Sequence, residues 1–218
     1  MIIKKTMKLI FLFPILFLIC QNSYGQSRYE LPKGYKVFKD MDDKQVRIDK
    51  DFDNDGVNDL AIMASKSNDE ENNYFFIFLN KDYTLKAIYY YFPISLSLGY
   101  DIKFENFVLS IGGCFGNGRY CETYKFKYYS NLMNMRLIGY DEESFGNAIH
   151  DGAYTKSINL LTGNFELEQH YFNVKLDKDI STNNVKKKIT IPLITLKSLD
   201  EKTLTYLHEV GSNYFKNE

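Results

Sequence analysis

Four aspartates crowd one short segment of the chain, at positions Asp51, Asp53, Asp55 and Asp59. Carboxylates held this close repel one another unless a cation neutralises them. The alternating spacing of the first three allows a tightly curled loop to direct them inward, and Gly56 supplies the sharp bend. Because Ca²⁺ takes about six to eight oxygen ligands in flexible geometry, the pattern predicts a structural calcium site.

The residues around these aspartates refine the prediction. Val57 offers a backbone carbonyl as a further ligand, and Asp59 closes the shell. Ile62 occupies the position where an EF-hand places a bidentate Glu, and residues 46–48 and 60–64 have the character of short strands, so a helix–loop–helix site is not expected. An acidic turn without an ion remains the alternative, because Asp, Asn and Gly also favour turns.

This strand–loop–strand pattern resembles the calcium loops of FG-GAP/VCBS-type repeats, the units of integrin-like β-propellers. The matching positions are Asp51, Asp53, Asp55, Gly56, Asp59 and Leu60. The resemblance covers residues 46–64, and the chain has one such loop with no Phe-Gly-Gly-Ala-Pro-like segment before it. It implies a calcium-binding β-ribbon, and a full propeller of repeated blades is not expected.

A second resemblance covers most of the chain after the N-terminal segment. Residues 136–140 and 157–163 are similar to segments of a group of exported bacterial proteins that carry one acidic loop near their start. That resemblance implies export and a similar fold. No activity comes with it.

The first 25 residues have the organisation of a secretory signal peptide. Three lysines precede an apolar run over residues 9–19, and Ser23 and Gly25 place small residues where a signal peptidase reads them. We therefore expect cleavage before Gln26 and a periplasmic or extracellular location. The apolar run is too short to predict a membrane span.

Cys20 leaves two other outcomes open. Acylation of Cys20 would make the protein a lipoprotein, although Ile19 stands where such signals normally have a small residue. An uncleaved N-terminal anchor is the third possibility. Mass measurement of the mature N-terminus would distinguish the three.

The charge of the chain argues against a nucleic-acid partner. Residues 1–25 contain three lysines and no acidic residue, so their removal lowers the formal net charge from −1 to −4. A nucleic-acid-binding domain would show a basic stripe. The run Lys186–Lys188 is the main basic cluster, and we interpret it as a solvated strand edge, with a polyanion site as the alternative.

Cys114 and Cys121 are the two cysteines that remain after signal cleavage, and an even pair in an exported chain predicts a disulfide. Residues 107–111 and 123–129 read as strands of a hairpin that would bring the sulfurs together. The glycines from Gly112 to Gly118 are expected to bend the connection. A free thiol pair or a metal site is the alternative, without a histidine nearby in sequence to support the latter.

The remaining sequence predicts one domain over residues 26–218 of all-β fold, with mainly antiparallel sheets in a partial propeller-like or sandwich arrangement and one C-terminal helix. The 18 Tyr and 17 Phe favour sheet. A polar loop is expected over 141–154. Further strands are expected at residues 74–79, 85–92, 135–140, 157–161, 165–171 and 189–196, where Pro192 suggests an edge.

The C-terminal helix is expected to begin with a capping box in which Ser198 is the N-cap and Glu201 its partner. Gly211 would end it. Its apolar face would consist of Leu204, Leu207 and Val210.

No catalytic motif stands out in the sequence. The acid pair Glu142–Glu143, or Asp177 with Asp179, could serve a glycosidase, but acid pairs in polar segments are usually solvated. His150 could bind metal and is more often simply exposed. The stripe at 89–92 could stack sugar rings, but neighbours on a strand point to opposite faces, and core packing explains it better.

These observations together predict an exported, calcium-stabilised, non-enzymatic binding module of the cell envelope or extracellular space, with a protein or glycan partner. One alternative is a hydrolase of envelope polysaccharide or protein, built around residues 141–154. Others are a periplasmic immunity-type protein and a lipoprotein scaffold.

Overall fold

The computed structural model describes most of the chain beyond the N-terminal segment. The described residues are 29–40, 42–67, 69–81, 84–92, 98–115, 118–148, 150–173 and 178–215. The predicted signal peptide, Cys20 and the cleavage site before Gln26 lie outside this set. Within it, no helix has the length and apolar character needed to cross a bilayer.

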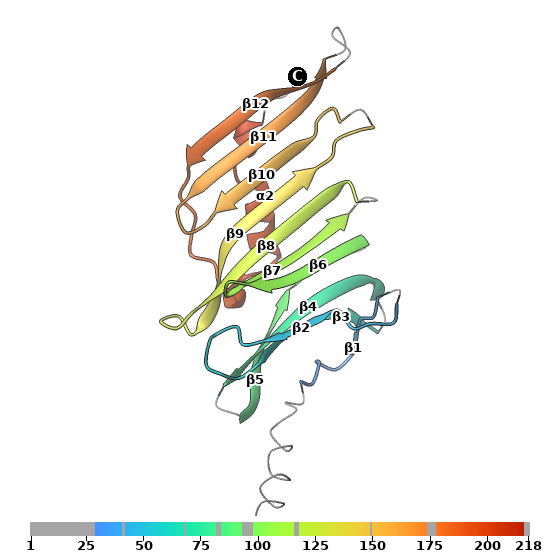
Figure 1. Cartoon of the computed structure of the whole chain (residues 1–218), viewed down its shortest axis with the longest axis vertical. Helices are drawn as coiled ribbons and strands as arrows, with labels where there is room; N and C mark the ends of the chain where they lie inside the picture. The colour runs from blue at the N-terminus through green and yellow to red at the C-terminus, as the bar shows by residue number, and fades with distance from the viewer. Residues whose placement is uncertain are drawn as a thin grey trace, which may run out of the picture.

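Two antiparallel sheets make up most of the fold (Figure 1), which confirms the predicted all-β class with one C-terminal helix. The smaller sheet runs in the order β1-β3-β4-β5, and β2 also pairs with β3. Its strands are β1 (Tyr35–Val37), β2 (Arg47–Lys50), β3 (Asp59–Lys66), β4 (Asp69–Lys81) and β5 (Thr84–Phe92). Because β1 and β2 pair with successive parts of β3, they lie end to end along one of its sides.

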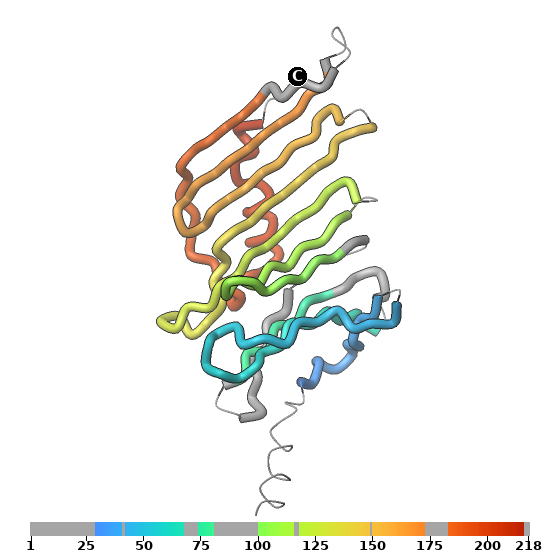
Figure 2. Tube along the Cα trace, in the orientation of Figure 1, coloured from blue at the N-terminus to red at the C-terminus, as the bar shows by residue number. Residues whose placement is uncertain are grey.

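The larger sheet is a meander in which each strand is antiparallel to the next one in sequence. Its strands are β6 (Leu98–Glu105), β7 (Val108–Phe115), β8 (Tyr120–Tyr129), β9 (Asn134–Ser144), β10 (Tyr154–Asn159), β11 (Asn164–Asn173) and β12 (Lys178–Lys188). The C-terminal segment then runs back across one face of this sheet (Figure 2). It contains η1 (Leu196–Ser198), α2 (Glu201–Glu209) and η2 (Ser212–Tyr214).

The central strands of the smaller sheet are apolar at successive positions because both faces are covered. Met63 and Phe75 belong to one face, which joins a core shared with the larger sheet. Ile62 and Phe76 belong to the opposite face, which packs against Tyr29, Leu31 and residues of β1. Residues 75–79 of the predicted strand at 74–79 are therefore buried on both sides.

The larger sheet has one buried and one solvated face, and its sequence alternates accordingly. Lys156 and Ile158 of β10 are buried, whereas Thr155 and Ser157 are exposed. We call the buried side the inner face; α2 covers part of it through Leu207, which is fully buried. The outer face carries polar rows such as Lys125, Asp141 and Ser157.

The predicted disulfide between Cys114 and Cys121 is present. The expected bend at Gly112 is wrong, because β7 continues through it and the two cysteines are direct cross-strand partners. A Cβ at Gly112 would lie 2.9 Å from the Thr123 hydroxyl oxygen, so close approach of β8 makes glycine suitable there.

Two predictions in the C-terminal half are also wrong. The expected loop over 141–154 is shorter, because β9 extends to Ser144 and β10 begins at Tyr154. Residues 189–196 do not form a strand; only Thr195 bridges to β9. Pro192 lacks the N–H of a ladder residue, and this segment leaves the sheet. The preceding strand, β12, carries the exposed Lys186–Lys188 at the sheet edge.

The C-terminal helix is present, but its cap differs from the prediction. Asp200 is the N-cap, and its carboxylate accepts a hydrogen bond from the Thr203 N–H at 2.8 Å. Ser198 instead closes the short helix η1, whose N-cap is Thr195. Gly211 follows the helix with a φ of 79°, a left-handed conformation that ends it as predicted.

Candidate functional site

The aspartate loop connects β2 to β3, which pair as an antiparallel hairpin. Asn54 and Gly56 have positive φ angles of 63° and 89°. Asn and Gly adopt this left-handed conformation most readily, so the local sequence favours the tight curl. The curl directs backbone N–H groups toward Asp51, whose carboxylate accepts hydrogen bonds from Asp55 at 3.1 Å and from Gly56 at 2.9 Å.

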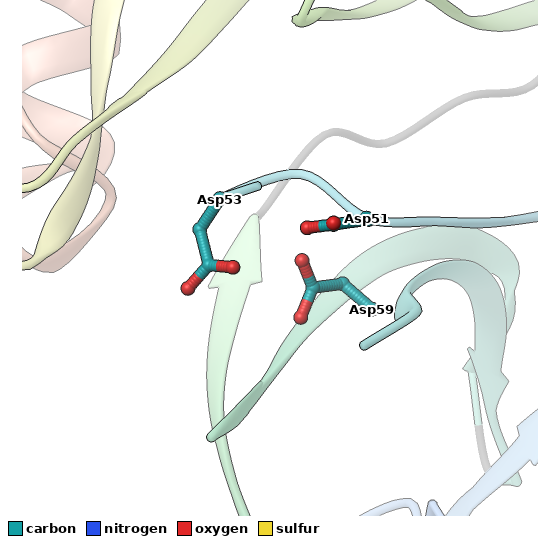
Figure 3. Close-up of side chains that lie close together, drawn as sticks. All are labelled: Asp51, Asp53 and Asp59. Atoms are coloured by element: carbon teal, nitrogen blue, oxygen red, sulfur yellow. The ribbon is translucent and has the colours of Figure 1, made fainter. Parts of the chain in front are cut away.

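Three of the four aspartates converge (Figure 3). Asp51, Asp53 and Asp59 each place a carboxylate oxygen within 4.8 Å of the others, and we call them the aspartate triad. Asp51 and Asp53 are partly buried, and Asp59 is completely buried. The donors are all carboxylate oxygens, which suit a hard cation better than a metal that prefers nitrogen or sulfur.

Two predicted ligands lie outside the triad. The Asp55 carboxylate accepts a hydrogen bond from the N–H of Val57 at 2.8 Å, which shapes the turn. Val57 contributes this N–H, whereas the predicted ligand atom is its carbonyl oxygen. Metal ligation by Asp55 and Val57 therefore stays a prediction.

Asp59 ties the loop to the middle of the smaller sheet. One carboxylate oxygen accepts the N–H of Phe52 at 2.7 Å, and the other accepts the N–H of Asn80, at the end of β4, at 2.8 Å. Burial raises the pKa of Asp59 from 3.8 to about 7, with Asp53 and Asp55 adding to the rise and the two backbone hydrogen bonds opposing it. A cation bound by the triad would favour the ionised carboxylate.

A second polar cluster lies on the inner face beneath α2, and sequence analysis missed it. The strand register places Glu122, Glu142 and Lys156 side by side on β8, β9 and β10. Lys156 and Glu142 are 1% and 2% exposed and form an ion pair. A buried charge is costly unless it is paired and hydrogen-bonded, so the partners of these groups define what the cluster does.

Four tyrosine hydroxyls donate hydrogen bonds to the two glutamates. Tyr140 lies between them, with its oxygen 2.9 Å from one Glu122 oxygen and 3.0 Å from one Glu142 oxygen. Burial, together with the charges of these carboxylates, raises the pKa of each tyrosine, so the hydroxyls stay protonated donors. The four are Tyr120, Tyr124, Tyr140 and Tyr154.

Lys156 also binds the last turn of α2. Its ammonium donates to the carbonyl of His208 at 2.7 Å and to that of Leu207 at 3.4 Å. Carbonyls at a helix C-terminus lack partners within the helix and carry partial negative charge. The His208 ring lies 3.3 Å from Glu142 and 3.0 Å from the Tyr120 hydroxyl. The cluster therefore anchors α2 to the sheet.

The sequence did contain a signal for this cluster. On a strand, residues two apart share a face, so polar side chains at alternate positions gather on one side. The repeated pairs are Tyr120 with Glu122, Glu122 with Tyr124, Tyr140 with Glu142 and Tyr154 with Lys156. What the sequence lacked was the register between strands.

The other candidate residues are not assembled into a site. Glu142 is buried and Glu143 is exposed, because neighbours on β9 point to opposite faces, so the pair does not flank a substrate bond. His150 is exposed in the loop 145–153. The remaining predictions concern side chains outside the described set, namely Asp177, Asp179 and residues 89–92.

Comparison with known proteins leaves the family open. No protein-family model, curated protein or solved structure matches the chain. The resemblances to FG-GAP/VCBS loops and to exported bacterial proteins therefore stay predictions.

Proposed function

We propose that the protein is an exported, calcium-stabilised binding module that acts in the periplasm or outside the cell and carries out no catalysis. The observation that supports this most directly is the convergence of Asp51 and Asp53 on the completely buried carboxylate of Asp59. Three carboxylates so close are costly unless a cation neutralises them.

Calcium fits this arrangement better than magnesium does. The triad supplies carboxylate oxygens in an irregular arrangement, which Ca²⁺ accepts, whereas Mg²⁺ demands near-ideal octahedral geometry and keeps several waters. Each carboxylate oxygen has a second lone pair, so the backbone hydrogen bonds to Asp51 and Asp59 are compatible with a bound ion. At the millimolar calcium of an extracellular setting, binding would stabilise the fold by roughly 0.4 to 1.4 kcal/mol.

Export is supported by two independent features. Residues 1–25 have the order of charge, apolar run and small residues of a signal peptide. The disulfide between Cys114 and Cys121 belongs to an oxidising compartment. A soluble mature form is preferred over a lipoprotein because Ile19 precedes Cys20.

A binding role is preferred over hydrolysis because of how the buried acids are used. Glu142 is engaged by Lys156 and by tyrosine hydroxyls beneath α2, so it serves to hold the helix. Although burial alone would raise the pKa of Glu142, its partners, chiefly Lys156, lower it below the ordinary value. An ionised, fully partnered carboxylate is a poor general acid.

Titration calorimetry and thermal unfolding test the calcium proposal. The full chain, expressed with export and processing, should bind one Ca²⁺ and melt at a higher temperature in calcium than in chelator. Asp53→Asn should abolish this difference, whereas Asp101→Asn, at an exposed aspartate of β6, should retain it. Absence of binding at millimolar calcium in the wild type would overturn the proposal.

A further inference from the structure

A cavity of about 220 Å³ adjoins the aspartate triad, where the loop of the smaller sheet meets β8 and the β6–β7 turn of the larger sheet. Its lining residues are Phe52, Asp53, Asn54, Phe107, Lys127 and Tyr128. Asp53 belongs to both the cavity and the triad. We infer that this cavity is the ligand site of the proposed binding module and that it takes one neutral sugar ring of a glycan. The inference rests on the proposed function.

Folding alone does not explain the placement of Phe107. It and Asn106 form the two-residue turn between β6 and β7, with φ angles of 60° and 52°. Turns with two positive φ angles strongly favour Asn-Gly, so phenylalanine in the second position is strained. Its ring packs edge-on against Phe104 and yet remains 50% exposed. An aromatic ring kept there despite both costs fits a role as the platform of a binding site.

The size and lining of the cavity match a single sugar ring. The cavity has a volume of about 220 Å³, whereas sites for drug-sized ligands have volumes of about 300–1,000 Å³, so it suits a smaller group. The half-exposed ring of Phe107 offers apolar aromatic surface to the C–H face of a sugar ring. Asp53, Asn54 and Lys127 offer acceptors and donors to hydroxyl groups, each of which both donates and accepts.

The charge balance favours a neutral ligand. Three ionised carboxylates in the triad, one divalent cation and the ammonium of Lys127 add up to no net charge. An acidic sugar would find no net positive charge to pair with, and the neighbouring Asp55 adds negative charge to the loop. An apolar peptide side chain would desolvate the ammonium of Lys127 without accepting a hydrogen bond from it. A neutral ring with several hydroxyls avoids both costs.

Amide NMR on the calcium-loaded protein tests the inference. After a screen on an array of neutral glycans, the selected sugar is titrated alongside cellotriose and maltotriose, with a glucuronate oligosaccharide and a mixed peptide library as competitors. A neutral sugar should shift the amides of Asn54, Phe107 and Tyr128. Phe107→Ala should weaken binding about tenfold, the worth of one aromatic contact. Phe107→Tyr should retain binding.

Phe145→Ala is the matched control, because Phe145 is also an exposed phenylalanine, at 40%, and does not line the cavity. It should bind the sugar as the wild type does. The inference would be overturned if both alanine variants lost sugar affinity equally. It would also be overturned if the protein preferred the acidic sugar or the peptides, or if it bound no neutral sugar.

Calcium calorimetry on the same proteins keeps the two proposals apart. Phe107→Ala should bind calcium as the wild type does, since its side chain is not in the triad. If calcium binds and no neutral sugar does, the cavity inference fails alone. If a sugar binds at the cavity and calcium does not bind, the calcium proposal fails and the sugar site stands.

Discussion

Asp59→Asn should remove a pH dependence from the stability of the calcium-free protein. Asp59 is completely buried and accepts the N–H groups of Phe52 and Asn80. Burial raises its pKa from 3.8 to about 7. The folded protein therefore holds a proton on this carboxyl over a pH range in which the unfolded chain has already lost it.

The sign and size of the change in the free energy of unfolding follow from the difference between the pKa of Asp59 in the folded protein and in the unfolded chain. Because the folded state binds the extra proton, the free energy of unfolding falls as pH rises from about 4 to about 7 and is level above that. The total loss is about 4 kcal/mol, since each pH unit between the two pKa values is worth about 1.4 kcal/mol. Asparagine at position 59 does not ionise. Because its amide NH₂ group cannot accept a hydrogen bond, one of the two backbone N–H groups loses its partner, which lowers the free energy of unfolding by about 1–3 kcal/mol at every pH.

Urea unfolding in chelator at pH 4 and pH 8 measures the effect. The stability of Asp59→Asn relative to the wild type should increase by most of about 4 kcal/mol between the two pH values. Saturating calcium should reduce the loss in the wild type, because a cation favours the ionised carboxylate. The same pH dependence in both proteins, whatever their offset, would refute the reasoning.

Three further changes test the rest of the fold by denaturant unfolding. Lys156→Met should cost about 3–5 kcal/mol because it leaves Glu142 buried without its cation, and adding Glu142→Gln should recover part of this; a larger loss in the double variant would contradict the pairing. Replacing Cys114 and Cys121 by Ser should cost about 2.5 kcal/mol on the chain-entropy account, and unchanged stability would count against it. Gly163→Ala should destabilise by about 1 kcal/mol or more, because its φ is 71° and the new Cβ would lie 2.4 Å from a backbone oxygen; a neutral result would show that the turn adapts.

Features set by neighbours in sequence were predictable. The aspartate loop and its flanking strands lie within one hairpin, so spacing alone indicated the convergence of Asp51, Asp53 and Asp59. The disulfide joins adjacent strands for the same reason. Spacing did not distinguish Asp55, which lies outside the triad and accepts the N–H of Val57 at 2.8 Å, and its ligation of a metal stays a prediction.

Features set by contacts between distant segments were not predictable. Glu122 and Lys156 lie on one row only because of the registers of β8, β9 and β10, which their sequences do not specify. Residues 189–196 are apolar enough for a strand, yet Ile194 and Leu196 are buried in the core where the chain leaves the sheet and enters η1. Apolar composition indicates that a segment is buried, but it does not indicate whether its backbone forms hydrogen bonds with a neighbouring strand.

The meander of the larger sheet has a consequence for folding speed. Each of its seven strands pairs with its sequence neighbour, so the sheet can grow hairpin by hairpin with short loop closures, and we expect a low contact order for a β-rich chain of this size. The docking of α2 on Lys156 joins residues about fifty positions apart. We therefore expect helix docking to be a late step, and the ammonium and its carboxylate partner to stay hydrated until then.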